Sequence, residues 1–295
     1  VWRNGIEFQS ADKQFRLHLG GRTQLDFGLY HASDDMQFGP GGTGAIRDGV
    51  NFRRGRVRAD GTMYEQIDFA VEYDFVNSAG TSDAVPTPTD GNFTIRELPV
   101  VGNFRIGLQK DPIGFDRLVS SRYLSFLERS YNQDAFYGPF NGGFIPGFLF
   151  FDNWGGERGT WWIGAFKTTN NGFQWNTGGG EYSWSARVTA LPIYENEGET
   201  LLHLGASYRL WSMDEGLTRL RSRGSVRSGL SSTWPVFANT GNLQGDGQDQ
   251  FNVELAGVWG PLNIQAEYLL SVLNNGFRTS PSNGDLYFHG GYIEA

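Results

Sequence analysis

Three arginines at alternate positions of one segment are the side chains whose types and spacing most clearly suit a binding site. Arg54, Arg56 and Arg58 lie in the stretch NFRRGRVRADG, so an extended chain places their guanidinium groups on one side. A guanidinium binds phosphate or carboxylate through two parallel hydrogen bonds, whereas the lysine ammonium is a point charge. The chain has 21 arginines and 3 lysines. This bias is a hint of oxyanion binding, although codon usage produces the same bias.

A second arginine series lies at Arg219, Arg221, Arg223 and Arg227, in LTRLRSRGSVR. These residues share parity, so an extended chain arranges them as a ladder. We expect this ladder to line an outer vestibule, within a long external loop that covers residues 212–249. The alternative is a solvated edge hairpin, because charged edges also deter aggregation.

A third group combines basic and aromatic residues in the segment 111–143. Lys110 precedes it, and it contains Arg117, Arg122 and Arg129 together with three tyrosines. Such a mixture suits a constriction that holds oxyanions through charge-assisted hydrogen bonds. In the alternative interpretation, Arg122 and Glu128 or Arg129 pair with carboxylates of the wall strands and only fix the segment in place. The two roles are compatible.

The elements that carry these side chains have a period of two. In residues 15–30 the odd positions are mainly apolar and the even positions mainly polar, over sixteen residues. A typical strand has about five or six residues, so this one is long enough to cross a bilayer obliquely. The same alternation returns in residues 67–75, 182–190, 202–210, 251–259 and 262–272.

The connections between these segments alternate in length. Short connections fall at 64–66, 99–102, 153–159, 192–199 and 260–261, and long ones at 32–49, 77–92, 111–143, 168–181, 212–249 and 274–285. Tight turns at one end and long loops at the other are typical of outer-membrane barrels. The sequence therefore predicts an all-β fold: one antiparallel up-and-down transmembrane β-barrel domain over residues 1–295, with about twelve strands in this chain.

A soluble β-sandwich or a lectin-like β protein also alternates apolar and polar residues. Such a protein buries its apolar face. Here the apolar faces carry tyrosine or tryptophan toward one end, as an interfacial aromatic girdle does. These aromatic positions are Tyr73, Tyr182, Trp184, Tyr208, Trp259 and Tyr268. They favour the membrane barrel.

Several functional classes are excluded by composition. No apolar run is long enough for a membrane-spanning helix. The chain has no cysteine, so it has no disulfide and no thiolate nucleophile. Its net charge of -8 argues against nucleic acid as a partner. The four histidines lack metal-ligand spacing, and the glycine-rich GPGGTG lacks the ending of a phosphate-binding loop. We therefore expect no enzymatic activity and no metal or other cofactor.

Three stretches resemble the phosphate-selective porin O and P family. The first is FRLHLGGRTQLDFGLY with NFRRGRVRADGTMYEQIDFAVEYDF, and the second is FRIGLQKDPIGFDRLVSSRYLSFLERS. The third combines LLHLGASYRLW, LTRLRSRGSVRSG, VFANTGNL and VELAGVWGPLNIQAEYLL. Together they cover most of the chain in the order that the family shows.

This resemblance implies a sixteen-stranded channel in the outer membrane of a Gram-negative-type bacterium. It also implies a homotrimer, a loop at 111–143 folded into the lumen, and lumen arginines that pass phosphate or related anions. The chain ends at GGYIEA, where the family continues. An open sheet in lipid leaves backbone groups without partners, so we expect a fragment that lacks about four strands. A smaller, independently closed barrel of twelve strands is the alternative.

The side of the sheet that faces lipid can be predicted from the cost of burying charge. Three arginines in hydrocarbon cost several kcal/mol each, so we expect Arg54, Arg56 and Arg58 to face the lumen. Arg53 has lipid-side parity and is expected above the membrane boundary. Carboxylates also share the inward parity, and they hold the arginines in position while weakening selectivity. They are Asp26, Asp60, Asp68, Glu72, Asp74, Glu254 and Glu267.

The sequence thus predicts a passive anion channel, with phosphate or a related oxyanion as the transported ion. The predicted site residues are Arg54, Arg56, Arg58, Lys110, Arg122, Arg129, Arg219, Arg221, Arg223 and Arg227. The alternative is a barrel that serves mainly as a structural or partner-binding element in a larger envelope assembly.

Overall fold

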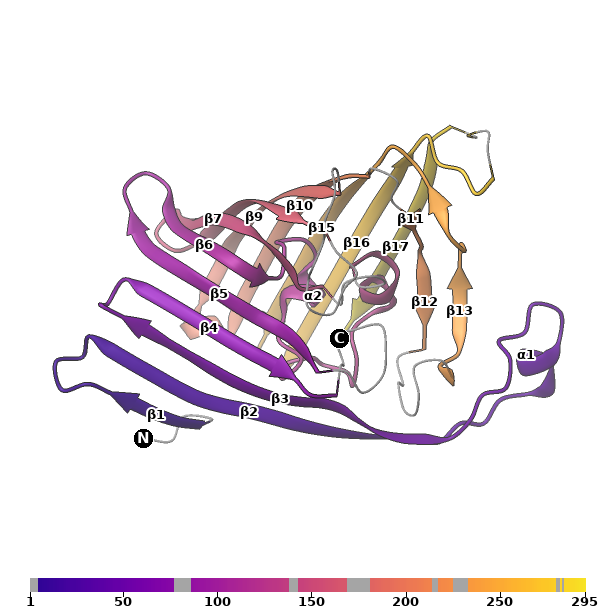
Figure 1. The fold of residues 1–295 in the computed structure, drawn as a ribbon, viewed down its shortest axis with the longest axis horizontal. Helices are drawn as coiled ribbons and strands as arrows, with labels where there is room; N and C mark the ends of the chain where they lie inside the picture. The colour runs from indigo at the N-terminus through magenta and orange to yellow at the C-terminus, as the bar shows by residue number, and fades with distance from the viewer. Residues whose placement is uncertain are drawn as a thin grey trace.

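One large antiparallel sheet of thirteen strands dominates the protein (Figure 1). The computed structural model describes residues 5–76, 86–137, 143–168, 181–213, 217–224, 233–279, 282 and 284–295. The strands of the sheet are, in order, β1 (Gly5–Gln9), β2 (Phe15–Gly28), β3 (Gly49–Met63), β4 (Ile67–Asp74), β5 (Thr87–Leu98), β6 (Gly102–Gln109), β7 (Ile145–Trp154), β8 (Gly159–Lys167), β9 (Tyr182–Glu195), β10 (Thr200–Ser212), β15 (Gly247–Trp259), β16 (Leu262–Asn274) and β17 (Leu286–Glu294).

The up-and-down order predicted from the alternating connections is confirmed. Each strand pairs with the next strand of this sheet along the chain, and every pairing is antiparallel. The described part of the sheet has one strand more than the predicted twelve, because the short β1 precedes the alternating segment and pairs with β2.

The long connections carry the smaller elements. Two small sheets pair β11 (Leu217–Thr218) with β14 (Leu243–Gln244), and β12 (Arg221–Arg223) with β13 (Val236–Asn239). The helical turns are α1 (Asp34–Phe38), α2 (Phe115–Leu118), η1 (Gln133–Tyr137) and η2 (Asn196–Gly198). In the part of the chain that the structure describes, no helix is long and apolar enough to cross a membrane.

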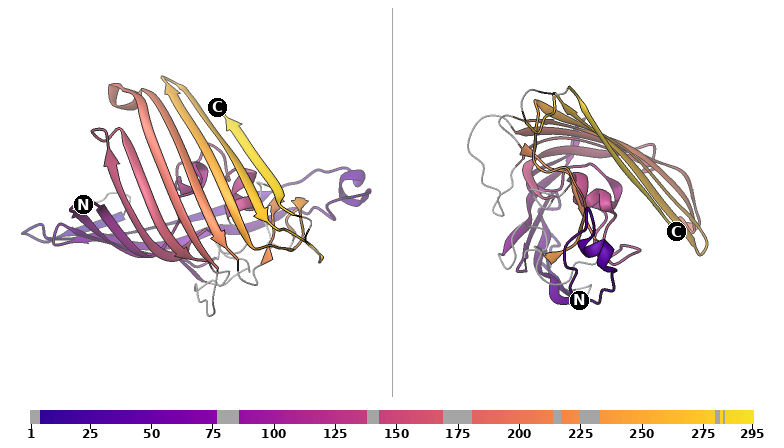
Figure 2. Two further views of the ribbon diagram at one scale, coloured as in Figure 1. Left: turned by 90° about the horizontal axis from the view of Figure 1, so that it is seen from above. Right: turned by 90° about the vertical axis from the view of Figure 1, so that its right-hand side faces the viewer.

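The sheet buries polar side chains and exposes apolar ones. In β15, Asn252 and Glu254 are buried, whereas Phe251, Val253 and Leu255 are exposed. The sheet curls, and the connection between β6 and β7, with α2, lies on its concave side (Figure 2). A soluble sandwich would place its apolar faces inside. The exposed apolar convex face therefore suits contact with hydrocarbon.

The predicted aromatic positions mostly follow this pattern. Tyr73, Tyr182, Trp184, Trp259 and Tyr268 are all exposed. Tyr208 is half-buried, and its hydroxyl donates a hydrogen bond to Asp249.

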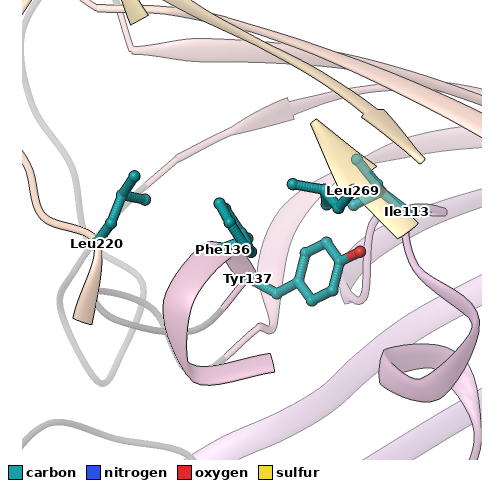
Figure 3. Packing of buried hydrophobic residues seen from close by; sticks show 5 residues of the cluster. All are labelled: Ile113, Phe136, Tyr137, Leu220 and Leu269. Carbon is teal, nitrogen blue, oxygen red and sulfur yellow. The ribbon is translucent and has the colours of Figure 1, made fainter. Parts of the chain in front are cut away.

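The connection between β6 and β7 has an apolar core of its own (Figure 3). We call its described residues, 110–137, 143 and 144, the inner segment. Its residues Ile113, Phe136 and Tyr137 form a buried cluster with Leu220 and with Leu269 of β16. Fully burying an aliphatic or aromatic side chain contributes roughly 1.5–3 kcal/mol. The cluster therefore stabilises the inner segment against the concave face of the sheet.

Candidate functional site

A cavity of about 900 Å³ lies between the inner segment and the concave face of the sheet. Among the described residues, fourteen basic side chains and six carboxylates line it, although the whole chain has a net charge of -8. The basic ones are Arg16, Arg22, Arg53, Arg54, Arg56, Arg58, Arg96, Arg105, Lys110, Arg117, Arg122, Arg129, Arg187 and Arg223. The carboxylates are Asp60, Asp68, Glu72, Asp90, Glu128 and Asp134. The cavity thus concentrates positive charge.

The alternating arginines of β3 lie along this cavity. Arg54, Arg56 and Arg58 all line it, while Val57 between them is exposed on the convex face. Carboxylates hold all three in ion pairs, and Arg54 pairs with Glu128 of the inner segment at 3.0 Å, whereas the other two pair with carboxylates of the sheet. The pairs within the sheet are Arg56 with Glu72 (3.0 Å) and Asp74 (2.9 Å), and Arg58 with Asp60 (2.9 Å) and Asp90 (2.7 Å). These pairs orient the guanidinium groups and reduce their pull on a passing anion.

The position predicted for Arg53 is wrong. In the pairing of β2 with β3, Gln24 is opposite Arg54 and Leu25 is opposite Phe52, so Arg53 is the extra residue of a bulge. Its side chain is 5% exposed and reaches the carboxylate of Glu128. Arg53 therefore joins Arg54 on the cavity side.

A signal for this bulge is present in the sequence. The exposed apolar residues of β3 change parity along the strand. Val50 and Phe52 lie at even positions, whereas Val57 lies at an odd position. The apolar phase therefore shifts by one residue between Phe52 and Val57. A strict period of two cannot hold across such a shift.

Three basic residues of the inner segment bond to backbone carbonyls, whereas a fourth, Arg117, forms an ion pair with Asp111. Lys110 Nζ donates to Arg117 O, Arg122 Nη2 donates to Gly21 O at 3.1 Å, and Arg129 donates through Nε to Asp116 O at 2.8 Å and through Nη2 to Val119 O at 2.6 Å. These bonds fix the side chains, and none of the three forms an ion pair with a carboxylate of the described residues. The carboxylate partners expected for Arg122 and Arg129 in the alternative interpretation are therefore wrong, although Glu128 of the same segment does bind the wall, through Arg53 and Arg54.

Arg22 of β2 belongs to the same group of charges. It lines the cavity, and its Nε is buried without a hydrogen-bond partner. Among the described residues, no carboxylate forms an ion pair with Arg22, Lys110, Arg122 or Arg129. We call these four residues the cation cluster.

Burial disfavours the charged form of Lys110. It lowers the pKa of the ammonium group well below its usual value, and the positive charges of Arg129 and Arg117 lower it further. A bound anion would offset this penalty by stabilising the protonated form. The cation cluster is therefore an environment in which an oxyanion is electrostatically favoured.

The inner segment is held in place by a carboxylate of the opposite wall. Glu267 of β16 accepts the backbone N–H groups of Phe115 (3.0 Å) and Asp116 (3.1 Å), at the start of α2. It also accepts hydrogen bonds from Tyr137 Oη (3.1 Å), Asn252 Nδ2 (2.8 Å) and Tyr292 Oη (3.1 Å). Because the carbonyl of Asp116 in turn binds Arg129, Glu267 indirectly positions the cation cluster.

The second predicted ladder is only partly assembled at the cavity. Arg223 lines the cavity and forms an ion pair with Asp134 of η1, at 2.6 Å. Arg219 hydrogen-bonds Asn239 at an exposed position, and Arg221 lies in β12 without lining the cavity. Arg227 lies outside the described residues.

Comparison with known proteins agrees with this architecture. The sequence profile of the family described as "Phosphate-selective porin O and P" matches residues 17–295. A curated protein, Porin O of Pseudomonas aeruginosa, is 22% identical over 304 aligned positions, which cover 90% of this chain. The aligned region is 61% of the length of Porin O, so the chain spans less than two thirds of this relative.

The family match covers nearly the whole chain, and the relative aligns over most of it. The polar concave face, the apolar convex face and the up-and-down order of the strands are those of an outer-membrane β-barrel. The chain therefore belongs to the phosphate-selective porin O and P family of outer-membrane β-barrel porins.

Proposed function

We propose that the protein is a passive channel for anions, with phosphate or a related oxyanion as the preferred ion. The cation cluster carries this proposal. Its four basic side chains face one cavity, and no carboxylate of the described residues pairs with them. Guanidinium and ammonium groups in a narrow aqueous passage replace the hydration shell of an anion and repel cations.

The arrangement also suits release of the anion. Conduction requires binding that is strong enough for entry and weak enough for exit. Arg56 and Arg58 are already paired with carboxylates, so an anion leaving the cation cluster meets weaker sites along β3. No covalent bond changes in this process. The proposed role is therefore transport and not catalysis.

Single-channel recording of the full-length protein in planar bilayers tests this function. We expect the reversal potential in a salt gradient to show preference for anions, and we expect phosphate to inhibit the chloride current. The double variant Arg22→Gln with Arg129→Gln should weaken phosphate inhibition about tenfold, because charge-assisted hydrogen bonds to the oxyanion are lost. A matched control is Arg58→Gln, since Arg58 is already paired with Asp60 and Asp90. Cation preference, or no conductance, would contradict the proposal.

We also propose that the channel is a homotrimer embedded in outer-membrane lipid. The exposed apolar side chains of the convex face support a hydrocarbon environment. The trimer rests on the family resemblance alone. Mass determination of the detergent-solubilised protein would test it, and a monomeric mass would contradict it.

A further inference from the structure

Glu128 of the inner segment occupies the space between two neighbouring guanidinium groups. Its Oε1 lies 2.5 Å from Arg53 Nε, and its Oε2 lies 3.0 Å from Arg54 Nη2 and 3.3 Å from Arg53 Nη2. The side chains of all three residues are at most 5% exposed, although all three line the cavity. One carboxylate is thus shared between two arginines.

The two arginines form a site with the geometry that an oxyanion requires. The bulge places consecutive guanidinium groups on the same side of β3. Arg54 is further oriented by a hydrogen bond from its Nη1 to Gln24 Oε1, at 2.6 Å. Two fixed guanidinium groups that converge on two oxygen atoms bind carboxylate and phosphate equally well in geometric terms.

We infer that Glu128 is a tethered anion, which holds the oxyanion position between Arg53 and Arg54 and which a passing phosphate displaces. This inference rests on the proposed channel function and adds a residue that sets its specificity. A doubly charged oxyanion gains more from two guanidinium groups than chloride does, because it presents more charge and several acceptor oxygens. Competition with Glu128 therefore favours phosphate over chloride.

The chain that precedes Glu128 is suited to such displacement. Tyr123, Phe126 and Leu127, which precede it, are 74%, 60% and 53% exposed, and the stretch 121–127 has no regular secondary structure. A segment with few buried contacts opens at low free-energy cost. The firmly anchored parts of the inner segment lie on either side of it, at α2 and from Arg129 to η1.

The competing interpretation is that Glu128 only pins the inner segment to β3. Removal of the Glu128 charge has different consequences in the two cases. A tethered anion, once neutralised, frees two arginines for phosphate. If Glu128 only holds the inner segment against β3, loss of its charge lets the segment move, and the passage becomes wider for every solute.

The variant Glu128→Gln in the full-length protein separates these outcomes. We expect the phosphate concentration that halves the chloride current to fall about tenfold. The flux of a neutral sugar into liposomes should stay unchanged. The control Asp60→Asn removes the same charge from the same cavity, but it leaves Arg58 paired with Asp90. It should therefore change phosphate inhibition less than about threefold.

A second variant keeps the test decisive if Glu128→Gln folds poorly. Glu128→Asp retains the charge but shortens the side chain by one methylene, so it should also strengthen phosphate inhibition, to a smaller extent. Unchanged or weakened phosphate inhibition in both variants, or a rise in sugar flux, would overturn the role of Glu128. A wild-type channel without anion preference would instead overturn the proposed function itself.

Discussion

Arg53 and Arg54 are consecutive residues of β3, yet both side chains contact the carboxylate of Glu128. Neighbouring residues of a regular strand point to opposite faces of the sheet. The bulge opposite Gln24 and Leu25 removes that constraint, because it inserts one extra residue into β3. Two positive charges thereby face the cavity where regular alternation would provide one.

The bulge makes a direct prediction about Arg53. Replacing Arg53 with glutamine should lower the anion-to-cation permeability ratio by about threefold or more, as should the same change at Arg54, because each removes a charge from the cavity. The reversal potential in a salt gradient measures this ratio. Arg47→Gln serves as a control, since Arg47 is exposed and does not line the cavity. An unchanged permeability ratio in the Arg53 variant would contradict the bulge, because Arg53 would then point away from the cavity as in a regular strand.

The lowered pKa of Lys110 predicts a dependence on pH. A lysine whose pKa is lowered loses its proton at a lower pH than free lysine does, so the channel loses one positive charge before the pH reaches the usual lysine range. We expect anion preference to decline as the pH rises through that interval. Lys110→Arg should abolish the decline, because arginine stays charged. An identical pH profile in the variant would show that another group is responsible.

Loss of Glu267 should release the inner segment. Replacement by alanine leaves buried N–H and hydroxyl donors without an acceptor, and we expect it to cost about 3 kcal/mol of stability. Neutral sugars should then enter liposomes faster, because α2 no longer binds the wall. Glu267→Gln keeps one acceptor oxygen and should lie between alanine and the wild type. Sugar flux at the wild-type level in the alanine variant would show that other contacts hold the segment.

The orientation of the sheet can be tested on its convex face. Val253 of β15 is 55% exposed there. Val253→Arg should destabilise the protein in lipid vesicles by about 2–4 kcal/mol, as arginine does at the bilayer midplane. Val253→Leu should be nearly neutral. Denaturant-dependent unfolding in vesicles measures both, and equal stabilities would indicate that this face contacts water.

The sequence by itself determined the architecture. Alternation such as that of residues 15–30 requires strands with one apolar and one polar face, and the alternating connections require up-and-down order. The same parity placed Arg54, Arg56 and Arg58 together on the polar face. These features could be predicted because they depend only on the local geometry of an extended chain.

Only the tertiary structure decided which charges remain available. The inner segment turns Lys110, Arg122 and Arg129 toward backbone carbonyls, whereas Arg56 and Arg58 meet carboxylates of their own sheet. Parity assigns a face but not a partner, because partners come from residues far apart along the chain. The contact of Glu128 with Arg53 joins positions 75 residues apart and depends on a single bulge. Electrostatic pairing of this kind depends on distances of a few ångströms, which only the folded chain fixes.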